Sequence, residues 1–440
     1  MNSENLKITA NLIDFIEASP TAFHAVENTA SILDEAGFTK LCEGETWVLV
    51  PGGKYYTTRN MSSIIAFALP EDTENLPFMI MASHTDAPCF KLKTDCETDA
   101  FGKYIKLNAE PYGGGIFSSW LDRPLSVAGR VITSEGGAFT AKTVKVDRDL
   151  VLIPNVAIHQ NRTINSGFAY NAAVDMMPLY SAADGKGTLK KIIADAAGVT
   201  EDSIVSSDLF LYNRTPASVW GADNEFFSCP GIDNRQCLYG TLTGFLNAVS
   251  DGGLSSILVF ASFDNEETGS STKQGAASPF LCDILSRIAE SFGTDLRRVL
   301  PSSFMVSADN GHAKHPNHPE LSDAKNVPHL NEGVVIKSNA AQKYTTDGIS
   351  AAIFTEICRR ADVPTQLFAN RSDMAGGSTL GSISNTQVSL NTVDIGMAQL
   401  SMHSAYETGG TADTAYLIKA SEAFFKTKIL CEGDGIYKIL

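Results

Sequence analysis

Residues 78–86 read FMIMASHTD, an unbroken run of apolar and small residues that leads directly into His84 and Asp86. A run of this kind predicts a strand that is buried on both faces, as the strands of parallel sheets are. His84 and Asp86 then stand at the carboxyl end of a buried strand. In open α/β sheets, this end of the strands faces the crevice in which ligands bind.

Apolar runs later in the chain also have acidic or histidine residues close behind them. They are SSILVFASF (255–263) before Glu266 and Glu267, SSFMVS (302–307) before Asp309, and VSLNTVDIGMAQLSM (388–402) before His403. Asp233 lies instead in the turn PGIDNRQ (230–236), which opens a helical pattern. One such acid is usually a helix cap or a turn former. Together, two histidines and several carboxylates provide the ligands that a pair of divalent metals needs, which predicts a two-metal hydrolase.

Helical patterns alternate with these runs and indicate the fold class. They span residues 6–18, 22–36, 236–249, 279–289, 349–360 and 414–425, and further strand patterns lie at 46–50 (TWVLV), 62–70 (SSIIAFALP) and 333–338 (GVVIKS). Strands that alternate with amphipathic helices predict an α/β fold, with a mostly parallel sheet covered by helices on both faces.

Between residues 94 and 218 the pattern changes to strand-like segments with glycine-rich turns, such as KYIKLNAE (103–110) and AKTVKVD (141–147). This region is predicted to be a β-rich domain inserted into the α/β fold. The remaining domain then consists of residues 1–93 and 219–440. Two domains suit a length of 440 residues, because one hydrophobic core rarely organises so long a chain.

The composition is that of a globular protein, with 43% hydrophobic and 19% charged residues. Acidic residues outnumber basic ones by 50 to 34, and the net charge of −16 argues against nucleic acid or an anionic membrane as a partner. We find no signal-peptide pattern and no apolar stretch long enough to cross a bilayer, which predicts a cytoplasmic protein. The eight cysteines include no CxxC pair, so neither a disulfide framework nor a thiolate zinc site is indicated.

Two local pairs indicate how roles are divided. His84 and Asp86 lie two residues apart, so in an extended chain they share a face and Asp86 can hold a ring nitrogen of His84. Glu266 and Glu267 are adjacent, and they cannot both face the same way if the strand continues. One of the two is expected to be a metal ligand and the other a general base.

At these residues the chain resembles the aspartyl aminopeptidase family of zinc aminopeptidases. The matching segments follow the family's order along nearly the whole chain: SPTAFHAV (19–26), SHTDAP (83–88), EPYGGGIFSSWLDRPLSVAGRV (110–131), LIPNVAIHQNR (152–162), GIDNR (231–235), FDNEETGS (263–270), SADNGHAKHPN (307–317), GVVIKSNAAQKYTTDG (333–348), GGSTLGSI (376–383) and SMHSAYETGG (401–410). A match of so many segments in the same order is not expected by chance.

The resemblance implies two zinc ions in each subunit, for which other divalent metals such as Co²⁺ or Mn²⁺ can substitute. Carried over residue by residue, the implied ligands are His84, Asp233, Glu267, Asp309 and His403. Asp233 is implied to bridge the two ions, Glu266 to be the general base, and Asp86 to support His84. The implied reaction removes the N-terminal residue from peptides with a free N-terminus, through a zinc-activated bridging water.

The resemblance also implies that the insert is a dimerisation domain, and that the homo-oligomer is a tetrahedral dodecamer built from dimers. His159 is implied to reach the neighbouring subunit's active site, with a role in catalysis and substrate binding. Lys337 is implied to belong to the substrate pocket. Members of the family prefer either acidic (Asp or Glu) or neutral N-terminal residues. Met374 and Ala375 depart from the usual form of the pocket-forming stretch, which argues against strict acidic selectivity.

Two other interpretations stay open. A related dinuclear zinc carboxypeptidase or deacylase would need a cationic pocket for a substrate carboxylate, instead of recognition of a free amine. An inactive assembly or cargo protein could retain the fold without the reaction. The presence of the whole ligand set together with Glu266 weakens this second interpretation.

Overall fold

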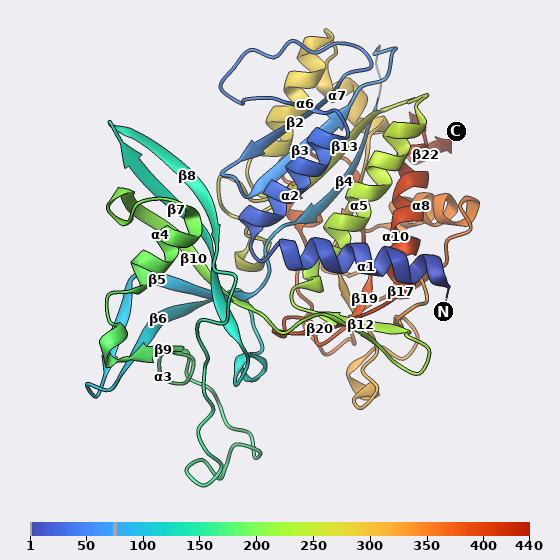
Figure 1. The fold of residues 1–440 in the computed structure, drawn as a ribbon. Helices are drawn as coiled ribbons and strands as arrows, with labels where there is room; N and C mark the ends of the chain where they lie inside the picture. The colour runs from blue at the N-terminus through green and yellow to red at the C-terminus, as the bar shows by residue number, and fades with distance from the viewer. Residues whose placement is uncertain (1, 74–76) are drawn as a thin grey trace.

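The computed structural model describes residues 2–73 and 77–440, and it is built around two large sheets (Figure 1). The larger sheet has the spatial order β1 (Thr39–Lys40), β2 (Lys54–Arg59), β3 (Ser63–Ala68), β13 (Ile257–Phe263), β4 (Phe78–His84), β14 (Phe304–Ala308), β18 (Asn391–Gly396), β16 (Val334–Lys337) and β17 (Thr365–Phe368). Its central strands β13, β4, β14 and β18 are all parallel. Antiparallel pairs occur only towards the edges, at β2–β3, β3–β13 and β16–β18.

The apolar run FMIMASH lacks alternation because both faces of β4 are covered. Met79 and Met81 pack into the hydrophobic core on one face of the sheet. Phe78, Ile80 and Ala82 pack into a second core on the other face. Every residue of β4 is buried, as expected for a strand in the centre of a parallel sheet.

Helices form these two cores with the sheet. The first core is shared with α2 (Ala22–Glu35), α5 (Ile232–Asp251), α8 (Gly348–Arg360) and α10 (Asp413–Phe425), and α1 (Ser3–Ala18) packs beside them. The second is shared with α6 (Phe280–Ser291), α7 (Leu296–Val299) and α9 (Leu380–Ser384). Helices α5 and α10 can approach closely because Gly244 has no side chain. A Cβ at this position would lie only 2.4 Å from Cβ of Ser421. The predicted α/β fold is confirmed.

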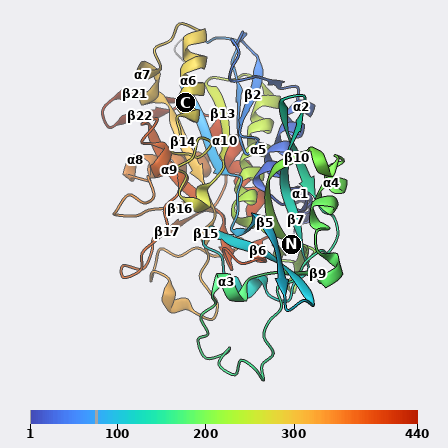
Figure 2. The same ribbon diagram turned by 90° about the vertical axis from the view of Figure 1, so that its left-hand side faces the viewer.

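The second sheet forms the insert, which faces the viewer in Figure 2. Its antiparallel strands have the order β8 (Ala138–Lys145), β7 (Leu125–Glu135), β10 (Ile204–Asn213), β5 (Cys89–Ala100), β6 (Tyr104–Tyr112) and β9 (Leu179–Ala182). Helix α4 (Leu189–Ala197) completes a separate core, and α3 (Ala172–Asp175) precedes β9. Since this sheet begins at Cys89, the predicted boundary at 93/94 falls inside β5.

A smaller sheet and a hairpin complete the fold. The smaller sheet has the order β11 (Ser218–Trp220), β12 (Phe226–Cys229), β20 (Glu407–Gly410), β19 (Ala398–Leu400) and β15 (Gly311–His312). The boundary predicted at 218/219 falls inside its edge strand β11. Strands β21 (Ile429–Gly433) and β22 (Ile436–Ile439) pair near the C-terminus. None of the helices in the described parts of the chain is long and apolar enough to span a membrane.

Two strand predictions were wrong. TWVLV (46–50) is not a strand, and Val48 is 80% exposed. Only Trp47 of this run is buried, where it stacks on Phe67, while the real strand β2 follows in KYYTTR. The run 388–402 is not one strand either, because β18 ends at Gly396 in the large sheet and β19 continues in the small one.

Candidate metal centre

The predicted ligands come from different elements, and three of them lie at or just beyond the carboxyl ends of parallel strands of the large sheet. His84 is the last residue of β4, and Asp309 directly follows β14. Glu267 lies in the 3₁₀ helix η4 (Glu266–Thr268) beyond β13. Asp233 is in the first turn of α5, and His403 follows β19. This arrangement follows from parallel strands, whose carboxyl ends share one edge.

The side chains converge around Asp233, which lies between two histidines. Its Oδ1 is 3.3 Å from Nε2 of His84, and its Oδ2 is 3.5 Å from Nε2 of His403. His84 Nε2 also lies 3.4 Å from Oδ1 of Asp309, and His403 Nε2 lies 3.5 Å from Oε2 of Glu267. The structure therefore brings together all five residues that the sequence proposed as ligands.

These donors suit a bound cation. Within the described parts of the chain, the buried oxygens Asp233 Oδ1 and Glu267 Oε1 have no hydrogen-bond partner. One ligand atom each from His84, Asp233 and Glu267 lie within 4.8 Å of one another. Burial raises the pKa of Glu266 to about 8 and that of Glu267 well above its usual range. Buried carboxylates without cations are costly, and a set of imidazole and carboxylate donors fits zinc.

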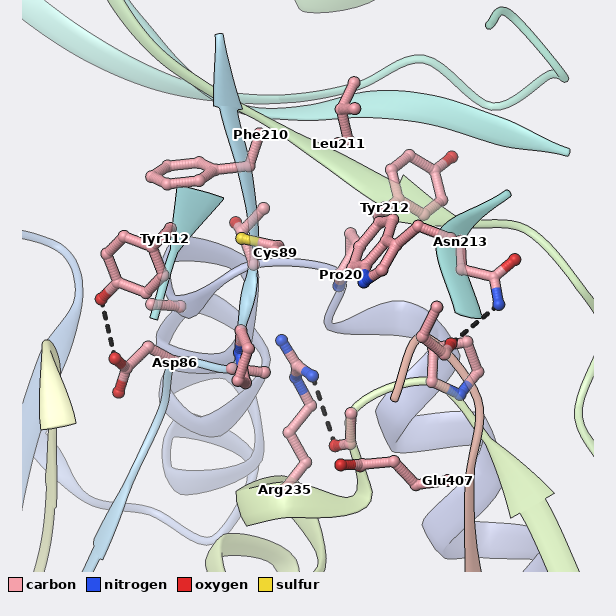
Figure 3. Close-up of a pocket in the computed structure, with 18 of the residues that line it drawn as sticks. Pro20, Asp86, Cys89, Tyr112, Phe210, Leu211, Tyr212, Asn213, Arg235 and Glu407 are labelled. Atoms are coloured by element: carbon pink, nitrogen blue, oxygen red, sulfur yellow. Dashed lines mark hydrogen bonds between the residues drawn. The ribbon is translucent and has the colours of Figure 1, made fainter. Parts of the chain in front are cut away.

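Asp86 connects several parts of this centre. Its Oδ1 lies 3.2 Å from Nδ1 of His84, on the opposite side of the ring from Asp233. The backbone N–H groups of Glu266 and Glu267 donate to its two oxygens, each at 3.2 Å. The hydroxyl of Tyr112 donates to Oδ2 at 2.7 Å (Figure 3). One carboxylate thus fixes a histidine and the turn that carries both glutamates.

Glu407 was not among the predicted site residues, although it is fully buried beside the ligands. Its carboxylate accepts the backbone N–H of Asp233 at 3.0 Å and that of His403 at 2.7 Å. Burial raises its pKa to about 8. The one signal in the sequence was its place in the segment SMHSAYETGG, four residues after His403. Because Glu407 acts on backbone groups, side-chain patterns gave no indication of this role.

Part of the insert also reaches the centre. Nδ1 of His403 bonds to the carbonyl oxygen of Gly114 at 2.9 Å, so Nε2 is left facing Asp233 and Glu267. The backbone N–H of Ile116 donates to the carbonyl of His403 at 3.0 Å. The segment that follows β6 therefore holds His403 from the side opposite the other ligands.

Lys337 is buried, with only 2% of its surface exposed. Its ammonium donates to the carbonyl oxygen of Asn310 at 2.8 Å and lies 3.5 Å from Oδ2 of Asp309. A cavity of about 370 Å³ beside His403 is lined by described residues that include His312, Met374 and Ala375, but not Lys337. Lys337 thus contacts a metal-ligand candidate and does not line this cavity.

His159 lies apart from the residues above. It is exposed and lies in the irregular segment 154–171, which follows β8 in the chain and ends directly before α3. This segment extends away from the body of the molecule in both views (Figures 1 and 2). No contact of His159 with the candidate centre of its own chain is present among the described residues.

Known proteins with a similar sequence or structure cover nearly the whole chain. Residues 15–425 match the model of the aminopeptidase I zinc metalloprotease family, M18. A probable M18 family aminopeptidase 2 of Clostridium acetobutylicum is 44% identical over 430 residues, which cover 96% of this chain and 99% of that protein. A relative of the same description from Pseudomonas aeruginosa is 38% identical over 431 residues, or 96% and 99% of the two chains.

Solved structures agree with these sequence matches. The structure of an Ape4 and Nbr1 complex superposes with a TM-score of 0.93 at 34% identity, covering 96% of this chain and 86% of that one. A Saccharomyces cerevisiae mApe1 dodecamer gives a TM-score of 0.84 at 28% identity, over 95% and 96% of the two chains. The chain therefore belongs to the M18 family of zinc metalloproteases and is a metal-dependent aminopeptidase.

Proposed function

We propose that this protein is a dinuclear zinc aminopeptidase that removes N-terminal residues from peptides. The observation that carries the proposal is the position of Asp233, whose two carboxylate oxygens face different histidines. Such a carboxylate is suited to bridge two ions. His84 and Asp309 would hold one ion, and His403 and Glu267 the other, as their distances pair them.

Bound zinc would supply a water of lowered pKa and would polarise the scissile carbonyl. The protein's own part in the reaction is proton transfer and positioning. Glu266 is half-buried beside the ligand Glu267 and is the candidate general base, which takes a proton from the attacking water and returns it to the leaving amine. Asp86 orients His84 and the turn of Glu266 through the contacts described above.

The carboxypeptidase or deacylase alternative receives less support. It needs a free cation in the pocket to pair with a substrate carboxylate. Arg371 lines the cavity beside His403, but its guanidinium is held by the two carboxylate oxygens of Asp373 at 2.6 and 2.7 Å. Lys337 is engaged by Asn310 and Asp309. The inactive-assembly alternative receives no support from a site that retains every proposed ligand and Glu266.

We further propose that the protein works as a homo-oligomer, with the insert as its dimerisation domain. A relative with the same fold is a dodecamer, which supports a dodecamer assembled from dimers here. The exposed segment 154–171 is placed to contact another subunit, and His159 is the residue we propose to act there. A preference for acidic N-terminal residues depends on Lys337 contacting the substrate side chain.

One experiment tests the function directly. Purified protein is analysed for zinc and then assayed with a panel of aminoacyl and peptide substrates, including N-acetylated peptides and peptides with an amidated C-terminus. We expect two zinc ions per subunit and cleavage that needs a free amine but not a free carboxylate. Co²⁺ or Mn²⁺ should restore activity after removal of zinc. Cleavage of N-acetylated peptides would favour the deacylase alternative, and a fully metal-loaded but inactive protein would favour the assembly protein.

A further inference from the structure

The insert contributes a tyrosine to the metal centre of its own chain. Tyr112 is the last residue of β6, and its ring packs edge-on against Phe210 of β10, with ring centroids 5.6 Å apart. Both rings line a pocket between the insert and the α/β domain, together with Asp86 (Figure 3). The tyrosine is therefore held by the insert while its hydroxyl points out of the insert towards Asp86.

The hydrogen bonds around Tyr112 have a defined direction. The carbonyl oxygen of the Asn265 side chain accepts from Thr272 at 2.9 Å and from Gln274 at 2.7 Å. Its amide nitrogen is thereby left to donate to the hydroxyl oxygen of Tyr112, at 2.8 Å. A tyrosine hydroxyl has a single hydrogen, so this hydrogen is committed to Asp86.

Asp86 connects Tyr112 to the groups of the metal centre. It accepts from Tyr112 and from the two backbone N–H groups of Glu266 and Glu267, and it lies beside Nδ1 of His84. Nδ1 of His84 also lies 3.2 Å from the backbone carbonyl oxygen of Asp86, so with Nδ1 protonated, both the carbonyl and the carboxylate of Asp86 can accept from it, and Nε2 is free to bind metal. Loss of the tyrosine hydroxyl would leave Asp86 with one donor fewer and greater freedom to rotate.

We propose that Tyr112 is a positioning residue for the metal centre of its own chain, acting through Asp86 on His84 and on the turn that carries Glu266 and Glu267. The proposal rests on the dinuclear site proposed above. The insert would then serve the reaction within one subunit, in addition to any role in assembly. Burial raises the pKa of the Tyr112 hydroxyl far above its usual range, so the residue stays protonated and remains a donor.

The test compares Tyr112→Phe with Tyr104→Phe. The first variant keeps the ring against Phe210 and removes only the hydroxyl. Tyr104 is the first residue of the same strand, is 52% exposed, and serves as the matched control. Zinc affinity is measured by competition with a chelator, the Co²⁺-substituted proteins are compared by visible absorption, and kcat and KM are measured separately.

For Tyr112→Phe we expect zinc affinity or kcat to fall by roughly 10- to 100-fold, the usual effect of losing a partner of a metal ligand. The Co²⁺ spectrum should change, and KM should stay within about twofold of the wild-type value. Tyr104→Phe should match the wild type in every measurement. A Tyr112→Phe protein that matches this control would overturn the proposal, as would a change confined to KM, which would indicate contact with the substrate.

A double variant separates action through Asp86 from action elsewhere. If Tyr112 works through Asp86, adding Tyr112→Phe to Asp86→Asn should lower activity and zinc affinity little further. Effects that multiply would contradict the proposal. The wild-type protein distinguishes this failure from failure of the proposed function, because zinc content and peptidase activity of the wild type test the dinuclear site independently of Tyr112.

Discussion

At the scale of single residues, Glu266 and Glu267 are neighbours with different expected roles. Glu266→Gln should leave zinc content nearly unchanged and lower kcat by roughly two to four orders of magnitude, because a positioned general base contributes about that much. The carboxylate of Glu267 lies 3.5 Å from Nε2 of His403, so Glu267→Gln should lose zinc instead. Metal analysis together with steady-state kinetics checks both variants. Loss of a metal from Glu266→Gln would require the two roles to be exchanged.

Asp233 gives a second prediction about single residues. Because its two oxygens face different histidines, Asp233→Ala should weaken both metals together. His84→Ala and His403→Ala should each weaken mainly one, since each histidine contacts only one side of the site. Metal titration with a chelator decides between these outcomes. An equal, partial loss in all three variants would contradict a bridging carboxylate.

Lys337 gives a third prediction, which concerns specificity. A lysine that pairs with an acidic substrate side chain would make Lys337→Ala lose activity on Asp and Glu substrates more than on Leu. The buried contacts of its ammonium with Asn310 and Asp309 favour a different result, a fall of similar size on every substrate. Measuring kcat/KM on Asp, Glu and Leu substrates with this variant tests it. A loss confined to the acidic substrates would show direct recognition.

The sequence proposed the side chains that meet at the centre, because each lies at or shortly after the end of an apolar run or opens a helix. Only its place in the segment SMHSAYETGG pointed to Glu407, because this carboxylate binds backbone N–H groups, and a backbone contact leaves no residue pattern. The substrate-pocket role of Lys337 stays a prediction, and the sequence did not indicate that its ammonium would lie 3.5 Å from Asp309. What a charge contacts depends on strands far apart in the chain, which local patterns do not record.

At the scale of elements, the turn after β6 must pass very close to the site. Gly113 has φ +71°, and a Cβ there would lie 3.0 Å from Cβ of Glu267 and 3.3 Å from its carbonyl oxygen. Gly113→Ala should therefore displace Glu267 and lower zinc affinity and activity by roughly tenfold or more, since small misplacements are costly in catalysis. Zinc affinity and activity are measured on the purified variant.

Gly102→Ala is the matched control for this prediction. Gly102 has φ +66° and nothing within 4 Å of its Cβ position. An alanine at either glycine therefore has the same backbone strain of about 1–2 kcal/mol, but only the alanine at position 113 meets a neighbouring residue. Both variants should show a similar drop in Tm, and only Gly113→Ala should lose activity. Equal activity in the two variants would mean that the approach to Glu267 is unimportant.

Elements were predicted well where burial dictates residue type, and poorly where it does not. The strand β4 and the helices of the α/β domain follow from apolar patterns on one or both faces. TWVLV has the composition of a strand, but its valines are exposed, while Trp47 stacks on Phe67 and Leu49 packs against the second core. The run 388–402 mixes apolar and polar residues along its whole length, so its division between two sheets at Gly396 has no clear local signal.

At the scale of the whole molecule, the insert links assembly to chemistry. Within one chain it supplies Tyr112 and the Gly114 carbonyl to the site. Segment 154–171, which belongs to the same insert, extends outwards with His159 exposed. A histidine on such a segment can reach a neighbouring subunit, where an imidazole donor could stabilise the oxyanion formed at the scissile carbonyl. Removing one such donor typically costs about 3 kcal/mol.

Isolated subunits should therefore be nearly inactive even with both metals bound, and His159→Ala should bind zinc normally but lose roughly 100-fold or more in kcat. Gln160→Ala, in the same exposed segment, is the matched control and should keep its activity. The decisive measurement mixes His159→Ala with Glu266→Gln subunits after dissociation and reassembly. In an isologous dimer each subunit serves its partner, so equal mixing should restore roughly a quarter of the wild-type activity. If subunit exchange is demonstrated and no activity returns, His159 does not act on the neighbouring subunit.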